Sequence, residues 1–232
     1  MQLQISDLRS GYGTVRIIND VSVGIKPGEI VAVIGRNGVG KTTLIKAIMG
    51  ALPCMSGSIT YRDNDITNLS AAGRARLGIG YVPQGRGIFT RMTVAANLTL
   101  GSGVGSAVAP DWKRAFSFFP ILEKRLPQLA GSMSGGEQQQ LAIGRILAGR
   151  PEIILFDEPS EGIQPNIVQE IGTIIRRLRD EEGLTIMIVE QNLQLIRSVA
   201  DYCLVMDKGQ IIARISPGEL EDPEVAQRYL AI

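Results

Sequence analysis

The segment IVAVIGRNGVGKTT, residues 30–43, carries the strongest structural signal in the chain. The continuous apolar run Ile30–Ile34 is expected for a strand that is buried on both faces of a parallel sheet. Residues 35–42 fit the spacing G-x-x-x-x-G-K-[ST], and a helix is predicted from about Lys41 to Met49. A strand, a glycine-rich loop and a helix in this order predict an α/β fold whose loop binds phosphate.

The glycines and the lysine of this loop indicate nucleotide chemistry. Glycine lets backbone N–H groups approach phosphate oxygens without side-chain clashes, and the positive end of the following helix favours the same anion. We expect Lys41 to reach the β- and γ-phosphates and the Thr42 hydroxyl to ligate Mg²⁺. A glycine-rich turn that binds nothing is the alternative, and the strand–loop–helix context argues against it. The residues assigned to the phosphate site are Gly35, Arg36, Asn37, Gly38, Val39, Gly40, Lys41, Thr42 and Thr43.

A second apolar run, Ile153–Phe156, ends in the acidic pair Asp157 and Glu158. Ligands bind at the carboxyl ends of the strands in open α/β sheets. We expect Asp157 to hold Mg²⁺, directly or through water, and Glu158 to orient or deprotonate the water that attacks the γ-phosphate. Taken alone, two acidic residues at the end of a buried strand more often simply face the solvent. Beside a phosphate loop, it predicts hydrolysis of a nucleoside triphosphate.

Predicted strands and helices alternate before and after a helical stretch in the middle of the chain. Alternating apolar segments before residue 30 predict antiparallel strands, and residues 101–110 predict a flexible connection. The sequence predicts an α/β core at 1–87 and 150–232, with an N-terminal antiparallel β subdomain and an inserted α-helical subdomain at 88–149. Further strands are predicted at Ile79–Val82, Thr185–Val189, Cys203–Met206 and Ile211–Ile215, and helices at Thr93–Leu100, Trp112–Phe119, Leu141–Ala148, Ile167–Leu178 and Leu193–Ser198.

Composition limits the chemistry that is open to this chain. It has 232 residues, 44% of them hydrophobic, and a formal net charge of +1, which gives no bulk electrostatic case for binding nucleic acid. The absence of histidine excludes histidine catalysis, and two cysteines argue against a zinc site. Apolar runs such as Tyr202–Met206 are far shorter than the ~20 residues of a membrane-spanning helix. Residues 1–10 lack the apolar core of a signal peptide. We therefore expect a single cytoplasmic globular domain.

The motif SGGEQQ, residues 134–139, precedes a predicted helix. Ser134 and Glu137 have the spacing of a capping box, which by itself only starts a helix. Gly135 and Gly136, however, leave the helix N-terminus bare, so that an anion can approach closely. The position of this motif between the phosphate loop and the acidic strand favours a role in the same chemistry.

These motifs together resemble the ATP-binding cassettes (ABC) of membrane transporters over essentially the whole chain. The resemblance implies a P-loop NTPase (ABC ATPase) fold and Mg²⁺-dependent ATP hydrolysis. It also implies that each ATP lies between the phosphate loop of one subunit and the signature of its partner, so that Ser134 and Gly136 act in trans. The remaining matched positions are Tyr12, which stacks on adenine, Gln84 of the glutamine loop, which joins Thr42 and Asp157 at the metal, and Gly135 and Glu137 of the signature.

Three positions depart from the general cassette pattern, and one of them is Gln164, which replaces the aspartate common in the dimer loop. Gln191 stands where most cassettes have a histidine that contacts the γ-phosphate. An amide donates the same hydrogen bond but cannot take up a proton, so we expect turnover without a kinetic pKa near about 6.5. Capping of the next helix is the alternative role of Gln191. Glu137 replaces the usual glutamine, and a carboxylate would repel the γ-phosphate. We therefore expect Glu137 to bind backbone N–H groups, leaving phosphate contact to Ser134 and the glycine amides.

Gln191, SGGEQQ and the phrase VEQN at 189–192 resemble the cassettes of branched-chain amino acid and amide importers. The phrase DEPSEGIQP at 157–165 looks most like the ATP-binding subunit of urea importers. This resemblance implies a subunit that is soluble when isolated and otherwise sits at the cytoplasmic face of the cell membrane. There it docks on a permease through its helical subdomain. A second cassette is implied as partner, in a heterodimer or a homodimer, and a periplasmic or extracellular binding protein takes part indirectly.

The sequence argues against two other function classes and leaves the cargo open. A soluble DNA-repair cassette needs a long coiled coil between Gln84 and the signature, and no sustained heptads occur there. A regulator without turnover is disfavoured by the intact Lys41, Asp157 and Glu158. Cassettes do not touch the transported molecule, so the residues leave urea, branched-chain amino acids and other amides open.

Overall fold

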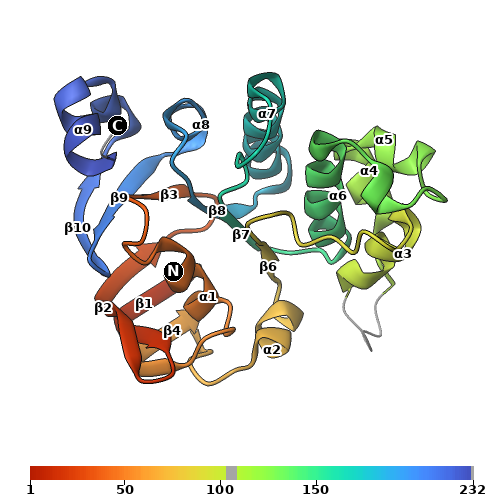
Figure 1. Ribbon diagram of the computed structural model, residues 1–232. Helices are drawn as coiled ribbons and strands as arrows, with labels where there is room; N and C mark the ends of the chain where they lie inside the picture. The colour runs from red at the N-terminus through yellow and green to blue at the C-terminus, as the bar shows by residue number, and fades with distance from the viewer. Residues whose placement is uncertain (103–108, 231–232) are drawn as a thin grey trace.

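The computed structural model describes residues 1–102 and 109–230. Figure 1 shows a larger lobe built from two sheets and their covering helices, and a smaller lobe built from helices α3 to α6. The connection predicted at 101–110 falls mostly on residues 103–108, which lie outside the described residues. Within the described part of the chain, no helix is both long and apolar enough to cross a membrane.

A six-stranded sheet forms the centre of the larger lobe. Its order is β10-β9-β3-β8-β7-β6, and all pairs are parallel except β9 with β10. Every residue of β3, β7 and β8 is buried, because both faces of the sheet are covered. The predicted interior strands are thereby confirmed. The strands are β3 (Ile30–Ile34), β6 (Ile79–Val82), β7 (Ile153–Asp157), β8 (Thr185–Val189), β9 (Tyr202–Asp207) and β10 (Gln210–Ile215).

A four-stranded antiparallel sheet, ordered β2-β1-β4-β5, covers one face of the central sheet together with helix α1 (Lys41–Ile48). Leu3 pairs with Ile25 and Ile5 with Val23, which confirms the predicted antiparallel strands. Helix α1 contacts strands of both sheets, so the helix that follows the phosphate loop is held from two sides. The strands are β1 (Leu3–Tyr12), β2 (Val15–Ile25), β4 (Cys54–Tyr61) and β5 (Asn64–Asp65).

Helices cover the other face of the central sheet and build the smaller lobe. Apolar side chains of α7 and α8 share one core with β3, β7 and β8, and this core continues into α3, α4 and α6. Helix α6 contacts α3, α4 and α5 of the smaller lobe and also strand β6 of the larger lobe, so it joins the two lobes. The remaining elements are α2 (Ala71–Arg76), α3 (Val94–Thr99), η1 (Leu100–Ser102), α4 (Trp112–Phe118), α5 (Pro120–Lys124), η2 (Ala130–Ser132), α6 (Gly135–Ala148), α7 (Pro165–Glu182), α8 (Leu193–Val199), η3 (Pro217–Glu221) and α9 (Pro223–Leu230).

The structure differs from the sequence-based elements at several points. The helix predicted over Trp112–Phe119 is confirmed as α4, which ends at Phe118, whereas α5 was not predicted and begins at Pro120, a residue that suits the first turn of a new helix but cannot continue an old one. Helix α6 starts at Gly135, well before the predicted Leu141, because Ser134 caps it. Strand β4 was not predicted, since its polar and glycine-containing first half is mostly exposed. The subdomain limits at 88 and 149 stay a prediction.

Candidate active site

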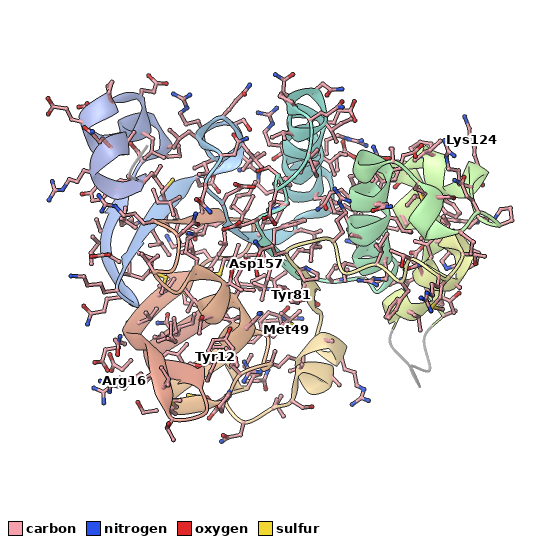
Figure 2. All side chains as sticks on the ribbon, viewed as in Figure 1. Tyr12, Arg16, Met49, Tyr81, Lys124 and Asp157 are labelled. Carbon is pink, nitrogen blue, oxygen red and sulfur yellow. The ribbon has the colours of Figure 1, made fainter. Side chains whose placement is uncertain are left out.

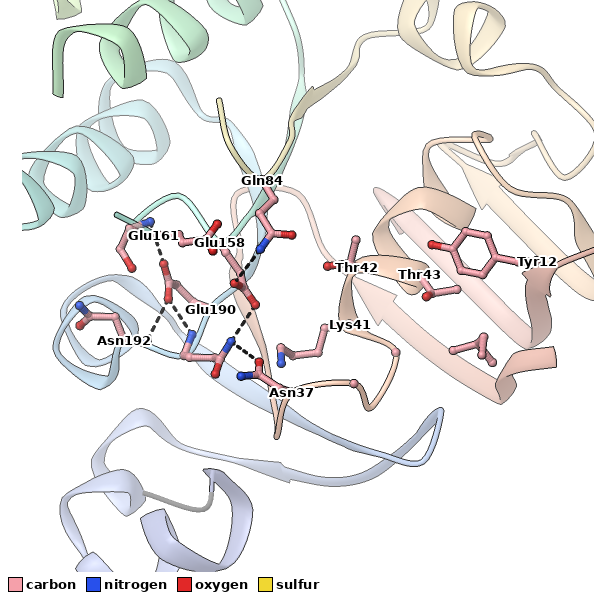
Figure 3. A pocket seen from close by; sticks show the side chains of 15 residues that line it. Tyr12, Asn37, Lys41, Thr42, Thr43, Gln84, Glu158, Glu161, Glu190 and Asn192 are labelled. Carbon is pink, nitrogen blue, oxygen red and sulfur yellow. Dashed lines mark hydrogen bonds between the residues drawn. The ribbon is translucent and has the colours of Figure 1, made fainter. Parts of the chain in front are cut away.

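A cleft of about 700 Å³ opens where β3, β7 and β8 end. These parallel strands deliver the loops that follow them to one edge of the sheet. Figure 3 shows side chains from these loops and from the antiparallel sheet facing one another across the cleft. The lining residues are Tyr12, Ile17, Asn37, Gly38, Gly40, Lys41, Thr42, Thr43, Gln84, Glu158, Ser160, Glu161, Glu190, Gln191 and Asn192.

Most residues assigned from the sequence line this cleft. Tyr12 stands at its rim with 47% of its surface exposed, which leaves an aromatic face open. Gly35, Arg36 and Val39 belong to the same loop but do not line the cleft, and Asp157 is fully buried. The sequence interpretation missed the other lining residues, which are Ile17, Ser160, Glu161, Glu190 and Asn192.

Hydrogen bonds from the Lys41 side chain connect the end of the phosphate loop to its start. Lys41 is buried, and its Nζ donates to the carbonyl oxygens of Gly35 at 2.8 Å and Arg36 at 2.9 Å. Burial lowers the pKa of Lys41, and the nearby carboxylate of Glu158 opposes that shift. Gly40 has φ +112, and a Cβ there would crowd core side chains at 3.2 Å. The loop therefore needs glycine at this position and keeps a cation at its centre.

Asp157 and Thr42 form an oxygen pair beneath the cleft. Thr42 Oγ1 donates to Asp157 Oδ1 at 3.0 Å, and the Tyr81 hydroxyl donates to Oδ2 at 3.2 Å. Figure 2 labels Tyr81 and Asp157 close together near the centre of the molecule. Burial raises the pKa of Asp157, and the two hydrogen bonds oppose that rise. A desolvated carboxylate beside a hydroxyl is a donor set that suits a hard divalent cation such as Mg²⁺. Tyr81 was not predicted, since it is remote in sequence.

Glu158 accepts hydrogen bonds from two glutamines that come from different segments. Gln191 Nε2 donates to its Oε1 at 2.8 Å, and Gln84 Nε2 donates to its Oε2 at 3.4 Å. Gln191 Nε2 also donates to Asn37 Oδ1 of the phosphate loop at 2.7 Å. Glu158 has φ +48, which is uncommon for a residue with a side chain. The carboxylate thus lies between the phosphate loop and the glutamine loop (Figure 3).

Glu190 is a buried carboxylate that connects two of the cleft loops. It accepts backbone N–H bonds from Ser160 at 2.9 Å, Gln191 at 2.6 Å and Asn192 at 2.8 Å. Ser160 follows β7, whereas Gln191 and Asn192 follow β8. Glu190 could have been identified from the sequence. It directly follows the apolar strand Thr185–Val189, and Asp157 stands in the same way at the end of the preceding apolar strand.

The signature lies in the smaller lobe and does not line the cleft. Ser134 Oγ accepts from the Glu137 backbone N–H at 3.4 Å, and Glu137 Oε2 accepts from the Ser134 N–H at 2.9 Å. Glu137 also pairs with Arg125 at 2.7 Å. The predicted capping role of Glu137 is confirmed. Gln191, in contrast, does not cap α8, whose first turn is capped by Asn192 at 3.0 Å.

Comparison with known proteins agrees with this fold and these motifs. The family model for "ABC transporter" matches residues 18–161. BraG of Pseudomonas aeruginosa, a high-affinity branched-chain amino acid transport ATP-binding protein, is 40% identical over 231 residues, covering 98% of this chain and 99% of BraG. LptB of Escherichia coli, a lipopolysaccharide export system ATP-binding protein, is 36% identical over 233 residues, covering 98% of this chain and 96% of LptB.

A solved structure also matches this chain over nearly its whole length. The crystal structure of the ADP conformation of MJ1267, an ATP-binding cassette of an ABC transporter, matches with a TM-score of 0.83 at 29% identity, covering 97% of this chain and 96% of that chain. The predicted fold is confirmed, and neither BraG nor LptB is named for urea. Because relatives and a solved cassette match it almost from end to end, this chain belongs to the ABC transporter family as an ATP-binding subunit that hydrolyses ATP.

Proposed function

We propose that this subunit powers import of urea or a related short amide through a membrane permease, by hydrolysing ATP in the cleft that contains Glu158. The placement of Glu158 carries the hydrolytic part of the proposal. Its carboxylate lies within hydrogen-bond distance of Gln191 and Gln84, beside the phosphate loop. A general base must lie where the attacking water approaches the γ-phosphate. The end of β7, which faces the same cleft as the loop at the end of β3, is such a place.

The chain's own residues supply complementary contacts for each part of ATP. The exposed ring of Tyr12 suits adenine, and the amides of residues 35–43 suit the phosphates. Lys41 exchanges its two carbonyl partners for β- and γ-phosphate oxygens. Gln191 donates to the γ-phosphate in place of Asn37. Each of these groups already faces the cleft or its floor.

Thr42 and Asp157, joined by Gln84, would hold Mg²⁺. Bound there, the ion would neutralise phosphate charge and polarise the γ-phosphate. A cation beside Asp157 would favour its ionised form and so oppose the rise in pKa that burial causes. Glu158 accepts the proton of the attacking water, and Gln84 and Gln191 hold its carboxylate in place during the transfer.

A partner cassette completes the site. The N-terminus of α6, where Ser134 precedes Gly135 and Gly136, suits a phosphate, yet it lies away from this chain's own cleft. We therefore assign these residues to the ATP of a second cassette subunit, in a heterodimer or a homodimer. In this arrangement the subunit sits at the cytoplasmic face of the membrane, where its smaller lobe contacts the permease. A binding protein on the other side serves the complex indirectly.

The cargo is proposed from sequence resemblance alone. The phrase DEPSEGIQP at residues 157–165 supports urea or a related amide. Branched-chain amino acid import is the second candidate, and the 40% identity with BraG favours it. Both candidates use the same hydrolytic site, so the cargo must be tested by transport.

The first experiment tests the base. Glu158→Gln keeps a side chain of the same shape that still accepts from Gln191, so ATP binding should be unchanged. Turnover, measured by phosphate release from the assembled transporter, should fall at least about a hundredfold because the base is lost. Glu170→Gln, the same change on the exposed face of α7, serves as control and should keep full turnover. Retention of most activity by Glu158→Gln would remove it as the base.

The second experiment tests the cargo. Cells that lack this subunit are assayed for uptake of labelled urea and labelled leucine, with rescue by the wild type or by Glu158→Gln. Loss of urea uptake that only the wild type restores supports urea import. Loss of leucine uptake instead replaces urea by branched-chain amino acids and leaves the hydrolytic assignment unchanged.

A further inference from the structure

The glutamine loop contains a short run of left-handed backbone next to Gln84. Gly85, Arg86 and Gly87 have φ values of +72, +73 and +60. Arg86 N–H donates to the Pro83 carbonyl at 3.1 Å, which closes the segment into a compact turn. Glycine adopts this conformation without strain, whereas a residue with a Cβ does so at a cost. A contact made by the Arg86 side chain has to offset that cost.

That contact reaches the signature helix of the same subunit. Arg86 Nη1 donates to Gln138 Oε1 at 2.9 Å, and Gln138 Nε2 donates to the Met133 carbonyl at 3.1 Å, directly before the helix cap. The guanidinium also lies against Gly135, where a Cβ would stand 2.9 Å from Nη2. Gln138 therefore connects the glutamine-loop turn to the backbone that leads into Ser134.

The guanidinium of Arg86 lies near the N-terminus of α6. A cation near the positive end of a helix is unfavourable, and among the described residues no carboxylate forms an ion pair with Arg86. Within residues 1–102 and 109–230, its side chain makes one hydrogen bond, to Gln138. An arginine that gains no ion pair and strains the backbone is expected where its contact serves a purpose other than stability.

Gln84 and Arg86 project from one turn towards two sites. Gln84 contacts Glu158 in this subunit's cleft, and Arg86 contacts the base of the signature. We propose that Arg86 is a positioning residue that transmits displacement of Gln84 to the signature, which serves the ATP bound by the partner subunit. This inference rests on the proposed function, because it requires the signature to act in trans.

A double-mutant cycle tests the coupling in the transporter assembled in membrane vesicles. Arg86→Gly removes the guanidinium together with the backbone strain, so the melting temperature should be no lower than that of the wild type. Its kcat should nevertheless fall about tenfold, with the KM for ATP unchanged within about twofold. Gln138→Ala should give the same fall. The double variant should also lie about tenfold below wild type, because both changes break one connection.

The control and the contrary results are equally specific. Arg91→Ala removes an exposed arginine from the same segment and should leave kcat unchanged. The proposal is overturned if Arg86→Gly turns over like Arg91→Ala, or if the double variant falls by about a hundredfold, as independent effects would. Failure of the proposed hydrolytic site would appear separately, as turnover retained by Glu158→Gln.

Discussion

In the proposed site, Gln191 would donate a hydrogen bond to the γ-phosphate through a side chain that does not titrate. Its Nε2 lies 2.8 Å from Glu158 Oε1 and 2.7 Å from Asn37 Oδ1. A histidine nitrogen donates in the same way, but imidazole exchanges a proton near about pH 6.5. The chain contains no histidine, so no imidazole in this subunit titrates there.

This difference predicts the pH dependence of turnover. The kcat of the wild-type transporter should show no inflection near about pH 6.5, whereas Gln191→His should introduce one. Phosphate release measured from about pH 5.5 to 8.5 for both forms checks this. Because both are assembled with the same partners, any histidine elsewhere in the complex is common to the two profiles. Identical profiles would show that the side chain at 191 does not contact the reacting phosphate.

Asp157 predicts a second pH effect, this time on stability. Burial raises its pKa, so the ionised carboxylate destabilises the nucleotide-free fold. Below the ordinary carboxyl pKa the group is protonated in both folded and unfolded chains, and stability falls as the pH rises through the higher folded pKa. Asp157→Asn should therefore raise the melting temperature at neutral pH, by a margin that shrinks towards about pH 4.

Calorimetry of the nucleotide-free subunit across this pH range measures that margin. The same variant should lose the stabilisation that MgATP gives the wild type, because a neutral amide holds the metal poorly. If the difference in melting temperature between Asp157→Asn and the wild type does not change with pH, the charge of Asp157 does not destabilise the fold.

At the scale of elements, helix α1 is anchored at its end by an arginine from α2. Arg74 is 1% exposed, and its Nη1 donates to the carbonyls of Ala47 at 2.8 Å and Ile48 at 2.7 Å. Its other nitrogens donate to the carbonyls of Leu69 and Thr67. A buried helix end needs such donors for its last carbonyls. Lys41 and Thr42 lie at the opposite end of α1, so the anchor fixes the helix that positions both.

Arg74→Met tests this anchor. Methionine fills similar space but leaves buried carbonyls without donors, so we expect a loss of about 3 kcal/mol or more in the free energy of unfolding. Arg76→Met, on the exposed side of the same helix, should change it by less than about 0.5 kcal/mol. Urea denaturation of the two variants gives both values. Equal losses would contradict the assignment of Arg74 as the anchor.

At the scale of the whole molecule, the sequence predicted what local spacing encodes. The phosphate loop, the acidic strand end and the capping box each lie within a few consecutive residues, and each lies where expected. Contacts between remote segments were not predicted. Tyr81 meets Asp157, and Arg86 meets Gln138, only because the strand order brings β6 beside β7 and helix α6 beside β6.

Strand β4 was not predicted from the sequence, for a related reason. Its first half alternates poorly in hydrophobicity, and it is a strand because β1 pairs with it. Tertiary partners decide the conformation of such segments more than their own composition does. The assignment of Gly135, Gly136 and Ser134 to a nucleotide likewise depends on a second subunit, which one chain's sequence does not contain.

The buried carboxylate of Glu190 has a consequence for the timing of catalysis. It accepts backbone N–H groups from the loop after β7 and from the loop after β8, so we expect Glu158 and Gln191 to move together. In the proposed mechanism both side chains would then approach a bound nucleotide in the same step. Gln84 lies on a separate turn, at the longer distance of 3.4 Å from Glu158, so we expect it to move independently of that pair. The same turn reaches helix α6 of the smaller lobe through Arg86, so the proposal makes movement of this turn the step that limits the timing of the cycle.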